Sequence, residues 1–150
     1  MDKTRIIAVA GKGGVGKTTS TVNLAASLGL LGKKVLLVDF DPQGNATSGV
    51  GIEKTEDNSA YDLTMGANPY NCIHKTEFEN LDALPSEISL AGAELELVDV
   101  KDRQYKLKTA LDTLRNDYDF MLIDCPPSLG LLTINALSAA DGVVVPMQCE

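Results

Sequence analysis

The feature that most constrains the fold of this chain is a glycine-rich run between an apolar segment and a segment with helical spacing. Residues 11–19 read GKGGVGKTT and match the phosphate-binding pattern G-x-x-x-x-G-K-[ST]. Glycines let successive backbone N–H groups point at one anion, the lysine adds positive charge, and the threonine hydroxyl can bind Mg²⁺. The residues expected to hold nucleotide phosphates are Gly11, Lys12, Gly13, Gly14, Val15, Gly16, Lys17, Thr18 and Thr19.

The segments on both sides of this loop indicate a strand before it and a helix after it. Residues 6–10 are an apolar run of buried-strand type, and Leu24, Leu28 and Leu31 recur at the spacing of one helix face. We expect strands at 5–10, 34–39, 81–84, 120–124 and 142–147, helices at 17–31, 60–66, 89–98, 106–115 and 133–140, and a loop at 41–58. This alternation predicts one α/β domain over residues 1–150, with a mostly parallel, doubly wound sheet and helices on both faces.

Composition argues against several other classes of protein. The 150 residues carry a net charge of −8, and residues 77–102 are strongly acidic, so the basic stretch of a nucleic-acid-binding domain is absent. No apolar run reaches the ~20 residues of a membrane span, and the N-terminus has no signal-peptide pattern, so we expect a cytoplasmic protein without a membrane partner. Three widely spaced cysteines and a single histidine, His74, fit neither a zinc site nor a Ser-His-Asp triad. His74 is expected in a loop.

Carboxylates follow two of the expected strands and complete the expected magnesium and nucleotide site. Asp124 ends the apolar run 120–124, which is the pattern of a Walker B acid, and Thr18 or a metal would give it a partner. Asp39 and Asp41 end the second strand, and Asp41 is the candidate for orienting the attacking water. The expected metal site is therefore made of Thr18, Asp41 and Asp124. All strands end at one edge of a parallel sheet, where ligands bind in such folds.

A second lysine in the loop, Lys12, makes the resemblance to a known family specific. The run 12–19 resembles the deviant Walker A loop of the ParA/MinD family of ATPases, and residues 38–49, 89–97, 123–130 and 133–137 resemble segments of chromosomal ParA/Soj proteins. The resemblance covers nearly the whole chain. It implies catalytic roles for Lys12, Lys17 and Asp41, with Lys12 reaching the ATP of a partner subunit. It also implies that Asp41, Asp124 and Pro126 join the loop in binding nucleotide.

The same resemblance implies a biological role and a set of partners. Members of this family bind ATP and Mg²⁺, form an ATP-dependent sandwich dimer, bind DNA without sequence preference and are stimulated by a ParB-type partner. The expected output is chromosome or plasmid segregation, with association of the protein with the nucleoid. The chain stops directly after its last expected strand, so it is read as the N-terminal part of the ATPase domain, with the DNA-binding surface in the missing part.

Three other functions use a similar loop and stay open at this point. A MinD-like membrane-associated ATPase would carry its membrane helix beyond this chain, although the segment 41–45, DPQGN, favours the ParA side. An electron-transfer ATPase like the nitrogenase iron protein needs paired cluster-binding cysteines, and Cys72 and Cys125 do not stand in that context. A module that binds nucleotide without turnover is disfavoured by the presence of Lys17, Asp41 and Asp124.

Overall fold

A six-stranded sheet organises the part of the chain that the structure describes. The computed structural model describes residues 4–11, 16–53 and 58–146. Within these ranges the strand order is β3-β4-β2-β5-β1-β6, and all pairings are parallel except that of β3 with β4. The strands are β1 (Arg5–Val9), β2 (Val35–Asp39), β3 (His74–Lys75), β4 (Leu81–Leu84), β5 (Phe120–Asp124) and β6 (Gly142–Val144). The expected mostly parallel sheet is confirmed.

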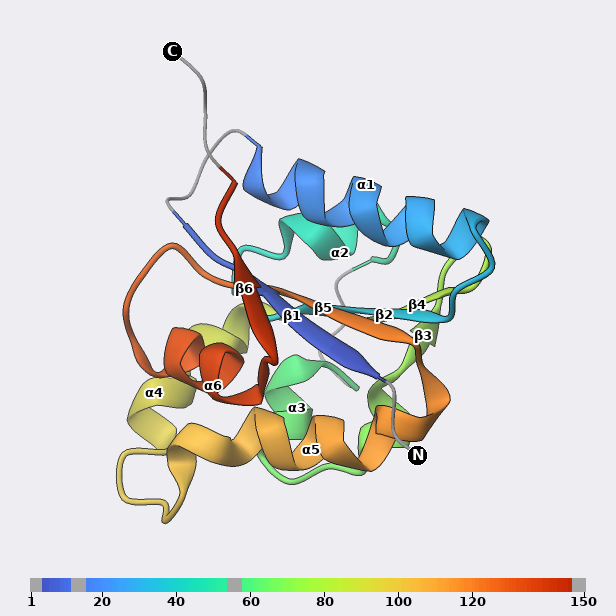
Figure 1. Cartoon of the computed structure of the whole chain (residues 1–150). Coiled ribbons are helices and arrows are strands. Elements are labelled where there is room, and N and C mark those ends of the chain that lie inside the picture. The colour runs from blue at the N-terminus through green and yellow to red at the C-terminus, as the bar shows by residue number, and fades with distance from the viewer. Residues whose placement is uncertain (1–3, 12–15, 54–57, 147–150) are drawn as a thin grey trace.

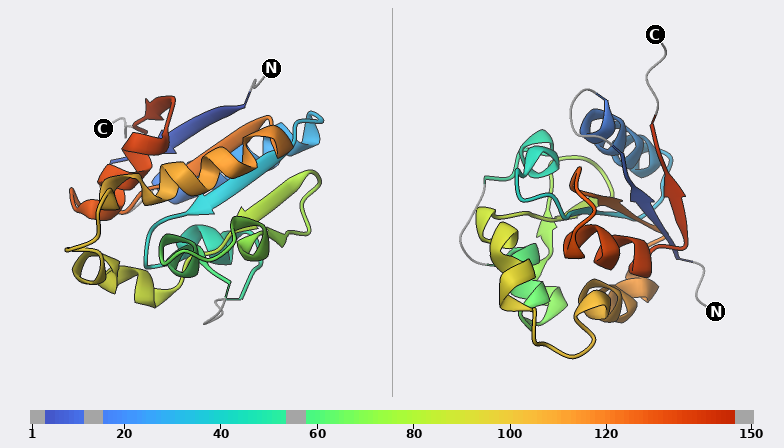
Figure 2. Two further views of the ribbon diagram at one scale, coloured as in Figure 1. Left: turned by 90° about the horizontal axis from the view of Figure 1, so that it is seen from below. Right: turned by 90° about the vertical axis from the view of Figure 1, so that its left-hand side faces the viewer.

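Helices cover both faces of this sheet, as the sequence predicted (Figure 1). Helices α1 (Lys17–Leu30) and α2 (Asn45–Gly49) lie on one face. The other face carries α3 (Ala60–Thr64), α4 (Ala93–Glu96), α5 (Lys106–Leu114) and α6 (Leu131–Ala139), and the turned views show the same two layers (Figure 2). Short 3₁₀ segments occupy Pro69–Cys72, Ile88–Gly92, Arg103–Tyr105 and Arg115–Asp117. Among the described residues, no helix is both long and apolar enough to cross a membrane.

The strands bury side chains on both faces because both faces are covered by helices. Leu36 of β2 and Met121 of β5 belong to the hydrophobic cluster beneath α3 to α6. Their neighbours Leu37 and Leu122 belong to the second cluster, beneath α1 and α2. This two-sided burial explains why the central strands are continuous apolar runs in the sequence.

Helix α1 forms where predicted but buries a different face. Of the three leucines that suggested the helix, Leu24 and Leu31 are exposed, at 40% and 76%, and Leu28 is partly buried against the second cluster. The buried positions are instead Thr21, Ala25 and Gly29, together with Lys17. At Gly29 an added Cβ would collide with the backbone carbonyl oxygen of Glu79, so the small residue permits a close approach to the turn before β4.

Other boundaries also differ from the sequence-based expectations. Helix α2 lies inside the segment 41–58 that was expected to be a loop. His74, which was expected in a loop, forms β3 with Lys75 by antiparallel pairing with β4. The helix expected at 89–98 is a 3₁₀ segment followed by the short α4. For His74, pairing with β4, which local patterns do not report, decides the structure.

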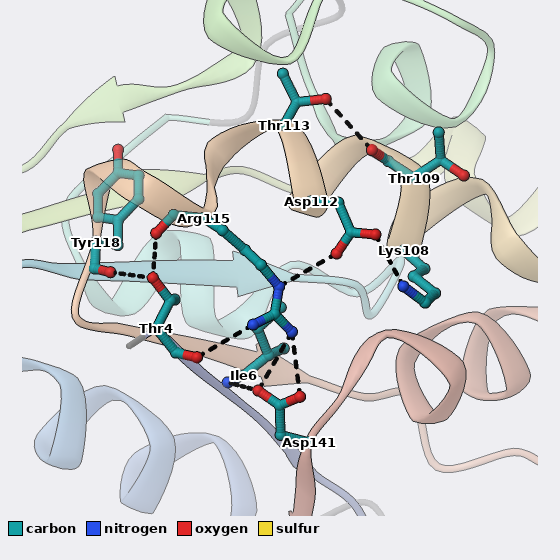
Figure 3. Close-up of polar contacts among 9 residues, drawn as sticks. All are labelled: Thr4, Ile6, Lys108, Thr109, Asp112, Thr113, Arg115, Tyr118 and Asp141. Carbon is teal, nitrogen blue, oxygen red and sulfur yellow. Dashed lines mark hydrogen bonds and ion pairs between the residues drawn. The ribbon is translucent and has the colours of Figure 1, made fainter. Parts of the chain in front are cut away.

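The amino edge of the sheet is held by a polar network that joins three segments (Figure 3). Asp141 accepts hydrogen bonds from the Ile6 backbone N–H at 2.9 Å and from the Arg115 guanidinium at 3.1 Å. The guanidinium also donates to the Thr4 carbonyl oxygen at 3.2 Å, and the Thr4 hydroxyl donates to the carbonyl oxygens of Arg115 and Tyr118. These contacts tie the start of β1 to the end of α5 and to the segment before β6.

The opposite, carboxyl edge collects the strand ends that the sequence marked as functional. In the pairing register Val9 lies beside Asp124, and Asp124 lies beside Asp39. The expectation that the end of the first strand and both strand-end carboxylates share one edge is therefore confirmed.

Candidate functional site

A cleft lies at the carboxyl edge, beside the first turn of α1. Its volume is about 780 Å³. Its walls come from α1, from the segment after β2 that includes α2, and from the loop after β5. The residues that line it are Gly16, Lys17, Thr18, Thr19, Val22, Asn23, Asp41, Gln43, Asn45, Gly49 and Pro127. Residues 16–19 and Asp41 belong to the predicted site.

Gly16 shows why this loop needs glycine directly before the lysine. It precedes the first helical residue with φ of 106°, a backbone conformation that side chains disfavour. The turn brings Lys17 to the start of α1, where the unpaired N–H groups and the positive end of the helix face the cleft. This arrangement suits an anion such as a phosphate.

Lys17 and Asp124 form a buried ion pair at the floor of the site. The Lys17 ammonium contacts Asp124 Oδ1 and donates a hydrogen bond of 2.6 Å to the carbonyl oxygen of Cys125. The exposed fraction is 4% for Lys17 and 0% for Asp124. Burial raises the pKa of Asp124 above its ordinary value, and the hydrogen bond and charge of Lys17 oppose this rise. Each charge depends on the other, because an unpaired buried charge is costly.

Thr18 and Asp124 present two oxygen atoms side by side. The Thr18 hydroxyl donates to Asp124 Oδ2 at 3.0 Å, so the acid receives one partner from each of two consecutive loop residues. A hydroxyl and a carboxylate suit Mg²⁺, which usually completes its shell with water and substrate phosphates rather than with an all-protein cage. Among the described residues no group of three or more His, Cys, Asp or Glu side chains could hold a metal alone. The donor set therefore fits Mg²⁺ bound together with a phosphate.

Asp39 and Asp41 differ in their surroundings, although the sequence treated them as a pair. Strand β2 ends at Asp39, so the alternation that would align the two side chains does not continue. Asp39 accepts hydrogen bonds from the backbone N–H and hydroxyl of Thr47 at 2.8 and 2.6 Å, which anchors α2. Burial raises its pKa to about 6, against the lowering effect of these bonds. Asp41 instead lines the cleft.

Several predicted residues require separate comment. Lys12, Gly13, Gly14 and Val15 lie outside the described residues. Gly11 follows β1 with φ of 134°. Pro126 is buried, and Pro127 is the proline that lines the cleft. Cys125 is buried and its pKa is raised to about 12, mainly by burial, so it packs as a small apolar residue.

Sequence reasoning missed the contribution of helix α2 and of the outer face of α1. Asn45 and Gly49 of α2, with Val22 and Asn23 of α1, complete the walls of the cleft. The α1 residues carry a usable signal, because they lie within two turns of Lys17. The α2 residues carry none, because their place depends on the side-chain contact of Thr47 with Asp39, which the sequence pattern does not report.

Comparison with known proteins agrees with this geometry. A family model described as an AAA domain matches residues 4–150. The chain is 57% identical to the sporulation initiation inhibitor protein Soj of Bacillus subtilis, over 97% of this chain and 59% of that protein. It is 53% identical to the chromosome-partitioning ATPase Soj of Treponema pallidum, over 100% of this chain and 58% of that protein. The chain thus spans less than two thirds of the length of these relatives.

A solved structure shares the fold and the site region. The crystal structure described as cobyrinic acid a,c-diamide synthase from Mycobacterium smegmatis, with bound ATP analogue and magnesium, superposes with a TM-score of 0.94 at 46% identity. The match covers 98% of this chain and 61% of that one. With the glycine-rich loop, the strand-end acids and the family match in agreement, the chain belongs to the AAA-domain family, within the ParA/Soj group of deviant Walker A ATPases.

Proposed function

We propose that the protein binds ATP with Mg²⁺ in this cleft and hydrolyses it. The observation that carries the proposal is the cluster of Lys17, Thr18 and Asp124, which places a cation, a hydroxyl and a carboxylate at the start of α1. Its support from relatives is that the similar M. smegmatis structure holds an ATP analogue and magnesium. The magnesium ion would neutralise charge on the transferred phosphate.

Each of the site residues named below has a distinct task in this proposal. Lys17 holds the outer phosphates, and Thr18, Asp41 and Asp124 hold the metal, directly or through water. Asp41 faces the same cleft and orients the attacking water. Backbone N–H groups at the start of α1, beginning with Gly16, bind phosphate oxygens without contributing a net charge of their own. Pro127 limits the cleft on the side of the loop after β5.

We further propose that hydrolysis drives a ParA/Soj-type switch in chromosome or plasmid partition. The names of the relatives support this role, as two of them are described as Soj proteins and a 50% identical relative from Myxococcus xanthus as chromosome partitioning protein ParA. The proposal includes an ATP-dependent homodimer in which Lys12 contacts the partner's nucleotide. It also includes a ParB-type partner, nonspecific DNA binding and nucleoid association. The MinD-like alternative is not favoured by these relatives.

The substitution Asp41→Ala tests the reaction and the switch together. We expect unchanged Mg-ATP binding and a fall in single-turnover hydrolysis of ~100-fold, because a misplaced reacting group alone can cost that much. Light scattering should then show a stable dimer with Mg-ATP and a monomer with Mg-ADP. Asp112→Ala, on the exposed face of α5, is the matched control and should behave like the parent chain. Unchanged turnover in Asp41→Ala would remove the water-orienting role.

A further inference from the structure

A closed ring of hydrogen bonds surrounds the backbone of Asp41. The Asp41 N–H donates to Asp39 Oδ1 at 3.2 Å, and Asp39 Oδ2 accepts from the Thr47 hydroxyl at 2.6 Å. The Thr47 hydroxyl in turn accepts from the Ser86 N–H at 2.9 Å, and the Ser86 hydroxyl donates to the Asp41 carbonyl oxygen at 2.6 Å. The ring thus returns to the residue from which it started.

The ring draws its members from three separate segments. Asp39 ends β2, Thr47 lies in α2, and Ser86 follows β4. The sequence distance from Thr47 to Ser86 is 39 residues, so the ring exists only in the folded chain. Asp39, Thr47 and Ser86 are at most 1% exposed and Asp41 is 6% exposed. Because water cannot readily replace a missing partner here, each bond of the ring constrains the others.

The ring uses both the backbone N–H and the backbone carbonyl oxygen of Asp41, while the Asp41 side chain lines the cleft. The carbonyl oxygen of Asp41 also accepts from the Gly44 N–H at 2.9 Å. Of the carboxylate, Oδ1 accepts from the Gln43 N–H at 3.0 Å. No hydrogen bond to Oδ2 occurs among the described residues, and Asp41 lines the cleft. The backbone is fixed while one carboxylate oxygen stays available.

We infer that Ser86 and Thr47 are positioning residues, which hold the Asp41 carboxylate where it orients the attacking water. Neither residue lines the cleft, so they act through Asp41. The effect on catalysis rests on the proposed ATP hydrolysis, whereas the ring of hydrogen bonds does not depend on it. The Ser86 hydroxyl is the more informative of the two groups, because its removal breaks one bond and leaves the backbone bond to Thr47 intact.

The first arm of the test measures the ring without any activity. In Ser86→Ala and Thr47→Val, hydrogen–deuterium exchange should rise in the peptide spanning 39–47 and stay unchanged in β5. Thr47→Ser keeps the hydroxyl and should restore protection. Ser89→Ala is the matched control, since Ser89 follows Ser86 by three residues, is exposed, and donates its hydrogen bond to Glu87 rather than to a member of the ring. Unchanged exchange in Ser86→Ala would overturn the inference whether or not the protein hydrolyses ATP.

The second arm asks whether the ring acts through Asp41. Ser86→Ala should lower the single-turnover rate about tenfold with little change in Mg-ATP affinity, since misplacement of a reacting group affects the chemical step. Added to Asp41→Ala, the same change should cost nothing further, because residues acting as one unit are not additive. A Ser86→Ala loss that persists in the Asp41→Ala background would overturn positioning through Asp41. Absence of hydrolysis in the parent chain would instead contradict the proposed function.

Discussion

Two polar networks tie distant segments of this chain together, one at each edge of the sheet, and they differ in burial. At the carboxyl edge, Lys17, Asp124 and Asp39 are at most 4% exposed. At the amino edge, the side chains of Arg115 and Asp141 are 22% and 44% exposed. Water can solvate a partly exposed charge whose protein partner is lost, whereas it cannot reach a buried charge. The buried groups at the carboxyl edge are therefore held in one arrangement, whereas the partly exposed groups at the amino edge mainly join the start of β1 to the segments after α5 and before β6.

The largest expected effect is that of Lys17→Ala. It should abolish Mg-ATP binding by removing the charge for the phosphates, and it should lower the free energy of unfolding by ~3 kcal/mol because Asp124 loses its buried partner. Isothermal calorimetry and urea unfolding at pH 7 measure the two effects. Adding Asp124→Asn should restore stability but not binding. Lys12→Ala, in the same loop, should spare binding by the monomer and weaken ATP-dependent pairing. A stable Lys17→Ala chain would show that the buried pair contributes little.

A pH effect at the same edge comes next. Burial raises the pKa of Asp39 from 3.8 to about 6, with a smaller contribution from the facing Asp124 charge. Because the folded state holds this proton more tightly, Asp39 contributes stability that is present below pH 3.8 and lost as pH rises through about 6. The gap corresponds to ~3 kcal/mol at most. Urea unfolding between pH 4 and 7, without nucleotide or Mg²⁺, should show this slope in the parent chain.

Asp39→Asn provides the comparison for that measurement, because an amide does not titrate in this range. Its unfolding free energy should vary less with pH than that of the parent chain, whatever its absolute stability. Equal slopes for the two proteins would show that Asp39 does not titrate between pH 4 and 6, and that its three hydrogen bonds outweigh burial.

The smallest expected effect belongs to the amino edge. Arg115→Ala should lower the free energy of unfolding by about 1 kcal/mol, a typical value for a partly exposed ion pair with additional hydrogen bonds. The loss should shrink in 1 M NaCl, where exposed charges are screened. Lys108→Ala, which removes an exposed pair with Asp112, is the control and should cost less. A loss as large as that of Lys17→Ala would remove the distinction between the two edges.

The parts of the molecule that could be predicted are those specified by local pattern. The central strands were visible as apolar runs, and α5 was visible because Leu107, Ala110, Leu111 and Leu114 share one face that is indeed buried. Lys17, Thr18, Asp41 and Asp124 were visible because a loop motif and strand ends fix their positions. Such features need only neighbouring residues to define them.

The parts that could not be predicted depend on distant contacts. Helix α2 was hidden in a polar segment, and its Thr47 hydroxyl accepts a hydrogen bond from the Ser86 N–H, 39 residues further along the chain. Strand β3 exists only through pairing with β4. Lys17 contacts Asp124, which lies 107 residues further along the chain. Ser86 bonds to Asp41, which lies 45 residues before it. No local pattern encodes these pairings.

The close approach at Gly29 fixes the position of the C-terminal end of α1. The end of this helix is held against the turn before β4, where the Asn80 side chain donates to the Gly29 carbonyl oxygen at 3.0 Å. Its other end carries Lys17, about 20 Å away for a helix of 14 residues. The helix is thus held at both ends, by this turn at Gly29 and by Asp124 at Lys17, so a bulkier side chain at Gly29 has to displace either the Glu79 backbone or the helix that carries Lys17.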